Sequence, residues 1–335
     1  MAQNNTNALA AVAVSGAAFA QVTLSGVVDM GYTDAKVEMA NTTLSQSKGL
    51  TDGIQNGGRI IVKGVEDLGG GLSATANLEW SISPSTADNS FANRQSHLTV
   101  AGGFGSVTLG RVYSLHHSNQ GAGDLVGNVS NAGYIGGMDS LVRASNAIVY
   151  TAPSFGGVTV AVELLTDPSA AAPGAAKTDG NGIRVSYAEG ALAAGFVQEN
   201  MDNYTADFSK LGGAVVDATL TGTVEKRTAR SLFASYDLGV AKVGLVSNNT
   251  SYDTLKWTAN TVSVSAPMGV VTLLGSMGNG QLKDGADKFK LSAYQLGAKY
   301  DLSKRTNLYF YTGQTKIKEI NAKFNQTSLG IKHSF

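Results

Sequence analysis

The sequence contains no cysteine and only five prolines in 335 residues, and its 25 basic and 25 acidic side chains leave no net charge. Without cysteine the chain has no disulfides, iron–sulfur clusters or thiol nucleophiles. So little proline argues against a proline-rich disordered chain. The neutral balance gives no reason to expect a nucleic-acid partner. A run of about 18 consecutive apolar residues is also missing, which excludes a helical membrane protein.

Motifs for catalysis and metal binding are missing as well. The sequence has no G-x-S-x-G elbow, no Walker loop and no H-E-x-x-H pattern. His116 and His117 are adjacent but lack a spaced third ligand for a metal ion. Either Ser114 or Ser118 could form a nucleophile–base pair with His116 in formal terms, and no further motif supports it. We therefore predict no enzyme activity, no cofactor and no metal site.

Residues 1–20 resemble a secretory signal peptide. The apolar stretch LAAVAVSGAAFA (9–20) ends in the A-x-A pattern of Ala18 to Ala20, and it is too short to cross a bilayer as a helix. The leading MAQNNTN departs from the pattern, since an export signal normally begins with basic residues. The alternative is an ordinary apolar first helix. We predict cleavage after Ala20 and a mature chain from Gln21.

Glycine is abundant, with 41 residues, and apolar residues alternate with small or polar ones. In 21–33, one set of alternate positions carries Val22, Leu24, Val28 and Met30, and the other set is polar. The same alternation runs through 324–335 to the last residue. A period of two indicates β-strands with one apolar and one polar face.

The connections alternate between short and long. Seven short turns, six of them containing glycine, fall near 67–71, 102–105, 153–157, 189–190, 237–239, 267–269 and 301–304. Eight longer polar loops fall near 34–56, 83–93, 114–142, 166–180, 201–226, 249–255, 279–287 and 316–323. Fifteen connections imply sixteen strands, with both termini on the side of the short turns. Most strands are near the 9–11 residues that a tilted strand needs to cross a bilayer.

Aromatic residues lie near the strand ends, as in the girdles of membrane barrels: Tyr32, Trp80, Phe104, Phe155, Tyr236, Trp257, Tyr300 and Tyr309. A soluble β-sandwich would not separate short from long connections so regularly. Backbone groups in lipid must be satisfied internally, so the sheet must close. We predict an all-β fold, a sixteen-stranded antiparallel transmembrane β-barrel over 21–335, wide enough for an aqueous channel with polar walls.

Several segments resemble the general porins of Gram-negative outer membranes, in particular the β-proteobacterial type. They are GGRIIVKGVEDLGGGL (57–72), FGSVTLGR (104–111), RASNAIVYTAPSFGGV (143–158), SYDLGVAKV (235–243) and YDLSKRTNLY (300–309). The resemblance covers essentially the whole mature chain. It implies a homotrimer in the outer membrane with periplasmic termini, in contact with lipid and lipopolysaccharide. It also implies that the third long loop, 114–142, folds into the barrel and narrows it.

The resemblance carries a constriction over to named residues. The family's wall arginines correspond to Arg59, Arg94 and Arg143, and Lys63 is a further inward position on the strand of Arg59. Alternation places Arg59, Lys63 and Arg143 inward, because Ile60, Val62, Ile148 and Tyr150 take the lipid side. Arg94 fits badly, since it shares its parity with Leu98 and Val100; a β-bulge or a strand start near it would repair this.

The loop offers two carboxylates, Asp124 and Asp139. Opposed to three or four basic side chains, they would leave an excess of positive charge, which favours anions. We predict a water-filled channel for passive diffusion of ions and small hydrophilic solutes, leaning toward anions. Two alternatives remain: a solute-specific channel, and a structural or adhesive barrel whose lumen is blocked.

The last strand is predicted to pair with the strand that begins at Gln21, which removes the free edges of the sheet. In the porin family a terminal aromatic such as Phe335 resembles the signal by which the barrel assembly machinery recognises its substrates. We therefore predict two roles for this end of the chain: a seam and an assembly signal.

Overall fold

The computed structural model describes residues 21–86, 93–127, 135, 141–166, 179–207 and 221–335. Within these residues the fold is almost entirely β, with seventeen strands and one helix, α1 (Leu115–Gly123). No helix of the described part is long and apolar enough to cross a membrane. The predicted signal peptide, 1–20, lies outside the described residues.

The strands follow one another along the chain. The first nine are β1 (Gln21–Met39), β2 (Thr42–Asp52), β3 (Arg59–Gly69), β4 (Leu72–Ser81), β5 (Asn93–Gly102), β6 (Gly105–Tyr113), β7 (Arg143–Thr151), β8 (Val158–Leu165) and β9 (Gly180–Glu189). The others are β10 (Leu192–Asp207), β11 (Thr221–Asp237), β12 (Lys242–Tyr252), β13 (Leu255–Met268), β14 (Val271–Asp284), β15 (Asp287–Asp301), β16 (Thr306–Ile317) and β17 (Ala322–Ser334).

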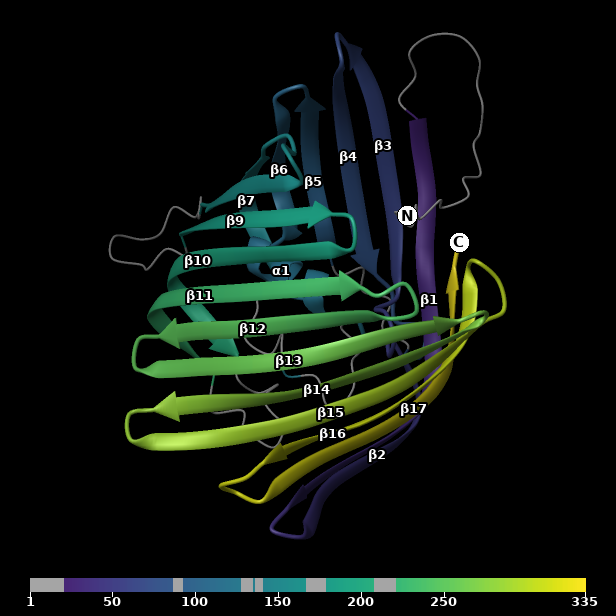
Figure 1. The fold of residues 1–335 in the computed structure, drawn as a ribbon, viewed down its shortest axis with the longest axis vertical. Coiled ribbons are helices and arrows are strands. Elements are labelled where there is room, and N and C mark those ends of the chain that lie inside the picture. Colours follow the sequence, from purple (N-terminus) through teal and green to yellow (C-terminus); the bar gives the residue numbers. More distant parts are fainter. Residues whose placement is uncertain (1–20, 87–92, 128–134, 136–140, 167–178, 208–220) are drawn as a thin grey trace.

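The sheet closes on itself, as predicted (Figure 1). On one side, β1 pairs with β17, and on the other it pairs first with β3 and then with β2. Because β2 and β3 occupy one position beside β1, the seventeen strands of the described residues form a sixteen-stranded antiparallel barrel. At the seam, Phe335 and Gly26 exchange backbone hydrogen bonds of 3.0 and 3.1 Å. The predicted pairing of the last strand with the first is therefore confirmed.

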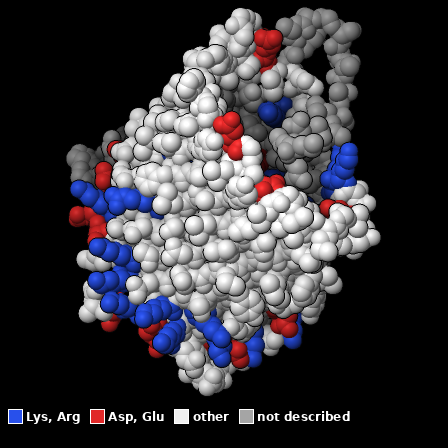
Figure 2. All heavy atoms as spheres, viewed as in Figure 1, with Lys and Arg blue, Asp and Glu red and all other residues white. Residues whose placement is uncertain are grey.

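The outer face of the barrel is apolar. In β12, Val243 and Leu245 are exposed, while the alternating Gly244 and Val246 are buried on the inner face. Figure 2 shows the consequence as a broad band without charges, with Lys, Arg, Asp and Glu gathered at the end where the hairpins β12–β13 and β14–β15 turn. A neutral apolar band between polar ends is what a membrane barrel requires.

The seven predicted short turns are present, but four of the predicted loops are wrong. The segments 34–56, 249–255, 279–287 and 316–323 are mainly strand, and the hairpins turn over two to four residues, as at Ala40–Asn41 between β1 and β2. Polar residues there reflect strands that continue beyond the apolar band, because backbone pairing does not need an apolar face. Composition alone could not separate a polar strand from a loop.

Two of the predicted girdle aromatics are also wrong. Trp257 is fully buried and Tyr309 is 1 % exposed, and both lie on inner faces. Trp257 shares its parity with buried Ala259, and Tyr309 alternates with lipid-facing Leu308 and Phe310. The remaining aromatics of that set lie outward or at strand ends. The inner surface is therefore not uniformly polar, since Trp257 belongs to a buried apolar cluster inside the barrel.

The inside of the barrel has two different walls. The helix α1 lies against the inner faces of β8–β12, which we call the covered wall. The inner faces of β3–β6, which we call the open wall, keep partly exposed polar side chains such as Asn77, Gln95 and His97. The side of α1 that does not contact the covered wall therefore faces the lumen and the open wall.

Candidate functional site: the constriction

Three arginines meet where the open wall faces the third loop. Arg59 begins β3, Arg94 lies near the start of β5, and Arg143 begins β7. The strand order places these starts side by side, because β3 to β7 are neighbours in the sheet. The three wall arginines predicted from the sequence are thus brought together, although the function of the cluster remains a proposal.

Glu79, on β4, joins two of these arginines. Its carboxylate is 3.3 Å from Arg59 Nη1 and forms a second ion pair with Arg94 Nε. Gln95 Nε2 donates to its other oxygen at 2.8 Å. The Glu79 side chain is 3 % exposed, so the ion pairs are shielded from water on the side of the wall. Glu79 holds the two guanidinium groups in place and neutralises one positive charge.

Tyr113, at the end of β6, joins the third arginine to the cluster. Its hydroxyl accepts hydrogen bonds from Arg94 Nη2 at 3.3 Å and Arg143 Nη2 at 3.4 Å. The Arg143 guanidinium also lies over the Tyr113 ring, 5.0 Å from its centroid, a cation–π contact. On the helix, His117 stacks against the same ring with centroids 5.2 Å apart. Tyr113 therefore connects the arginine cluster to α1.

The poor parity of Arg94 is explained by a bulge. The pairing of β4 with β5 runs from Glu79↔Gln95 directly to Trp80↔Asn93, which leaves Arg94 without a partner position. The extra residue reverses the alternation, so Arg94 turns into the lumen although Leu98 and Val100 keep their own parity. The predicted repair by a β-bulge is what the structure contains.

Lys63 lies on the inner face of β3, as predicted, two inward positions from Arg59. It is exposed, and its partners across the sheet are Asn77 and Thr23. No ion pair to Lys63 occurs among the described residues. Lys63 thus adds a positive charge to the open wall, between the arginine cluster and the short turns.

The two loop carboxylates have different outcomes. Asp124 caps the end of α1: its backbone N–H donates to Gln120 O, and its side chain accepts from Val126 N at 3.1 Å. It lies on the loop, as predicted. Asp139 lies outside the described residues. The described parts of the loop lie inside the barrel, where Val126 and Ile135 are both buried.

Two wall carboxylates hold the start of α1. Glu163 Oε2 accepts from the backbone of Leu115 at 3.1 Å, and Glu199 Oε1 accepts from that of His116 at 2.5 Å. Glu199 is in turn paired with buried Arg227, 3.3 Å away. Carboxylates suit this position because the first N–H groups of a helix lack partners within it and carry partial positive charge. The helix is therefore fixed to the covered wall rather than loosely laid on it.

A second inward segment was missed by the sequence analysis. Residues 53–58, between β2 and β3, turn into the lumen, where Ile54 is 2 % exposed. Gln55 Nε2 donates to Tyr311 OH at 3.1 Å, and the backbone of Asn56 donates to Asp29 at 2.6 Å. Ile54 forms a buried cluster with Val126 of the loop. The signal was the GIQNGG sequence (53–58), whose glycines surround an apolar residue inside a predicted polar loop.

Glu79 and Tyr113 were missed too. Their roles depend on which strands are neighbours and in what register, and alternation along one strand does not give that information. Among the residues that the structure describes, no group of three His, Cys, Asp or Glu is placed to hold a metal ion.

A closed barrel with an apolar outside, an inward loop and an arginine-lined passage defines a channel protein of an outer membrane. The comparisons place it within that class: the chain belongs to the Gram-negative porin family, whose model matches residues 8–319. It therefore resides in the Gram-negative outer membrane and belongs among channels rather than enzymes. The structural or adhesive alternative is not favoured.

The similar proteins align with this chain over nearly its whole length. An outer membrane porin protein of Bordetella pertussis is 30% identical, over 98% of this chain and 97% of its own length. The outer membrane porin protein 32 of Delftia acidovorans is 30% identical over 98% of each chain. Among solved structures, an anion-selective porin from Comamonas acidovorans has a TM-score of 0.79 at 24% identity, covering 94% of this chain and 100% of that one.

Proposed function

We propose that this porin lets ions and small hydrophilic solutes diffuse passively across the outer membrane, with a preference for anions. The observation that carries the preference is the charge of the arginine cluster at the constriction. Three arginines stand against the single carboxylate of Glu79 in the described cluster, and three minus one leaves two positive charges. A narrow passage with low-dielectric walls strengthens the effect of such an excess on passing ions.

Two further observations support this proposal. Lys63 extends the positive wall beyond the cluster. The solved structure of similar fold from Comamonas acidovorans is described as an anion-selective porin. Opposite the cluster we assign Asp124, and with it Asp139 of the same loop, as the negative side of a transverse field that orients dipolar solutes.

The test is the reversal potential of the purified protein in a planar bilayer under a potassium chloride gradient. We expect a potential of the sign set by chloride. The double variant Arg59→Ala with Arg143→Ala removes two wall charges and is expected to lose most of the preference. The matched control, Lys304→Ala with Arg305→Ala, removes two charges from the exposed turn between β15 and β16 and is expected to change it little. A cation-selective wild-type channel would contradict the proposal.

We also propose that the working unit is a homotrimer in contact with lipid and lipopolysaccharide, inserted by the barrel assembly machinery after removal of 1–20. A trimer of independent pores predicts conductance that rises and falls in groups of three equal steps. N-terminal sequencing of the protein purified from outer membranes is expected to begin at Gln21. An intact leader in membrane-inserted protein would contradict cleavage after Ala20.

A further inference from the structure

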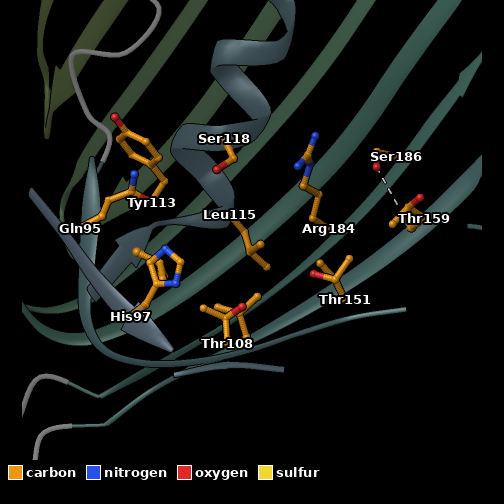
Figure 3. Close-up of a pocket in the computed structure, with 13 residues that line it drawn as sticks. Gln95, His97, Thr108, Tyr113, Leu115, Ser118, Thr151, Thr159, Arg184 and Ser186 are labelled. Carbon is orange, nitrogen blue, oxygen red and sulfur yellow. Dashed lines mark hydrogen bonds between the residues drawn. The ribbon is translucent and has the colours of Figure 1, made fainter. Parts of the chain in front are cut away.

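A cavity of about 340 Å³ lies in the lumen between α1 and the inner faces of the neighbouring strands (Figure 3). Its lining comes from β5–β9 and the first half of α1. One part of the lining is apolar, formed by Val112, Leu115 and Val149. Another part carries the hydroxyl groups of Ser118, Thr151 and Thr159. The lining of the cavity thus combines apolar side chains with hydroxyl groups, whereas the constriction beside it is lined by charged side chains.

One cation faces this cavity without an acidic partner. The side chain of Arg184, on the inner face of β9, forms no ion pair or hydrogen bond with any described residue, and its Nε is buried without a partner. Figure 3 shows Arg184 on the side of Thr159 and Ser186, with Gln95 and His97 across the cavity. A guanidinium that is partly removed from water and left unpaired is unfavourable unless something else satisfies it.

The nearest wall carboxylates are already engaged. Glu163 and Glu199 both pair in register with Gly182, one inward position beyond Arg184 on β9. Their carboxylates accept the backbone N–H groups of Leu115 and His116 at the start of α1. These acids hold the helix, and Arg184 is left facing the cavity.

We propose that Arg184 is the anchor of a second solute-binding subsite, which takes small hydroxylated carboxylates; this inference rests on the proposed anion preference and deepens it. A guanidinium pairs with a carboxylate through two parallel hydrogen bonds. The hydroxyls of Ser118, Thr151 and Thr159 match the hydroxyls of such a solute, and the apolar lining matches its carbon chain. An inorganic oxyanion could use the arginine but not the apolar lining.

The subsite is placed in series with the constriction. Tyr113 lines the cavity and also binds Arg94 and Arg143 of the wall cluster. A carboxylate that leaves the cluster toward the short-turn end therefore passes from one set of guanidinium groups to another. Sites in series let a solute be attracted without being held in one deep well.

The experiment measures block of the chloride current through the wild-type protein in a planar bilayer by gluconate, a hydroxylated carboxylate. In Arg184→Gln we expect the half-blocking concentration of gluconate to rise about tenfold, because a charged hydrogen-bonding partner is lost. Arg184→Lys keeps the charge but loses the paired geometry, and an intermediate rise is expected. Heat-resistant migration of each variant as an assembled species checks that it has folded.

The matched control is Lys299→Gln, which removes another inward positive charge, on β15 and outside the cavity. Its half-blocking concentration for gluconate is expected to stay within about twofold of wild type. Equal shifts in Arg184→Gln and Lys299→Gln would overturn the subsite. A loss of phosphate block in Arg184→Gln as large as the loss of gluconate block would overturn the assignment to carboxylates. A cation-selective wild type would instead overturn the proposed function, so the two failures are distinguishable.

Discussion

Glu79 contacts two of the three wall arginines while almost wholly buried, so it sets both their position and their net charge. Without it, three guanidinium groups would repel one another in a narrow space. Its carboxylate also cancels one positive charge of the cluster, which weakens the expected preference for anions. Glu79 therefore fixes the positions of the guanidinium groups but lowers the positive electrostatic potential of the constriction.

Replacing Glu79 with Gln tests this balance. The amide keeps the size of the side chain but removes the negative charge, so the anion preference in reversal-potential measurements should increase about two- to fourfold, from the interaction of one unit charge with an ion about 5 Å away in water. Thermal stability of the assembled protein should fall, because two ion pairs are lost. The control Glu66→Gln changes an exposed carboxylate near a short turn. An unchanged or weaker anion preference in Glu79→Gln would contradict the role given to this residue.

At the scale of single residues, the alternation of apolar and polar residues along a strand limits what can be predicted from the sequence. Arg59 and Lys63 were placed correctly because Ile60 and Val62 fix the faces of one regular strand. Arg94 could be placed only with a bulge whose position no pattern gives. Glu79 was missed because its partners lie on the two neighbouring strands, and the register between strands is not written in either one alone.

At the scale of elements, α1 fits the covered wall by close backbone contact. A side-chain Cβ added to Gly244 of β12 would lie 2.3 Å from Gly123 O at the end of the helix. Ser263 Oγ also donates to Gly123 O and accepts from Leu125 N, each at 3.1 Å. Glycine at position 244 therefore lets the end of α1 lie this close to the wall.

Gly244→Val should push the end of α1 into the lumen and lower the single-channel conductance, with a loss of stability of about 1–3 kcal/mol from overpacking. The matched control is Gly275→Val on β14, where no atom lies closer than 3.5 Å to an added Cβ. Conductance of the control should stay at the wild-type value. If Gly244→Val conducts as the wild type does, the contact between helix and wall does not set the width of the passage.

The elements themselves were only partly predictable. Six of the seven short turns carry glycine, since tight turns need backbone angles that other residues resist. The hairpins at 34–56 and 279–287 were mistaken for loops because they are rich in polar residues such as Asn, Asp, Ser, Lys and Thr. The inward segment 53–58 was missed because only its tertiary partners, Asp29 and Tyr311, distinguish it from an ordinary loop.

At the scale of the whole molecule, closure of the barrel depends on the two ends of the chain. The backbone bonds between Gly26 and Phe335 lie at the seam, and an added Cβ at Gly26 would overlap the Phe335 ring. The closed topology was predicted correctly, because an open sheet edge in lipid is not tolerated. Whether the terminal aromatic is also read by the assembly machinery stays a prediction.

Deletion of Phe335 should lower the yield of membrane-inserted protein sharply, while the conductance of any barrels that form stays close to that of the wild type. Outer-membrane fractions from matched cultures measure the yield, and planar bilayers measure the conductance. Phe335→Tyr, which keeps a terminal aromatic, should assemble normally. Normal yield after the deletion would argue against the assembly signal, whereas an altered pore at normal yield would point to the seam alone.

The unequal walls of the lumen have a consequence for how such a channel can change over generations. On the inner faces of β8–β12, a substitution that changes the volume of a side chain requires α1 to repack. Folding therefore constrains the residues on that side of the interior. Positions such as Lys63, Asn77 and His97 face water and can vary without that burden. We therefore expect substitutions that change the passage to be tolerated mainly on the inner faces of β3–β6, while the inner faces of β8–β12 are constrained by their packing against α1.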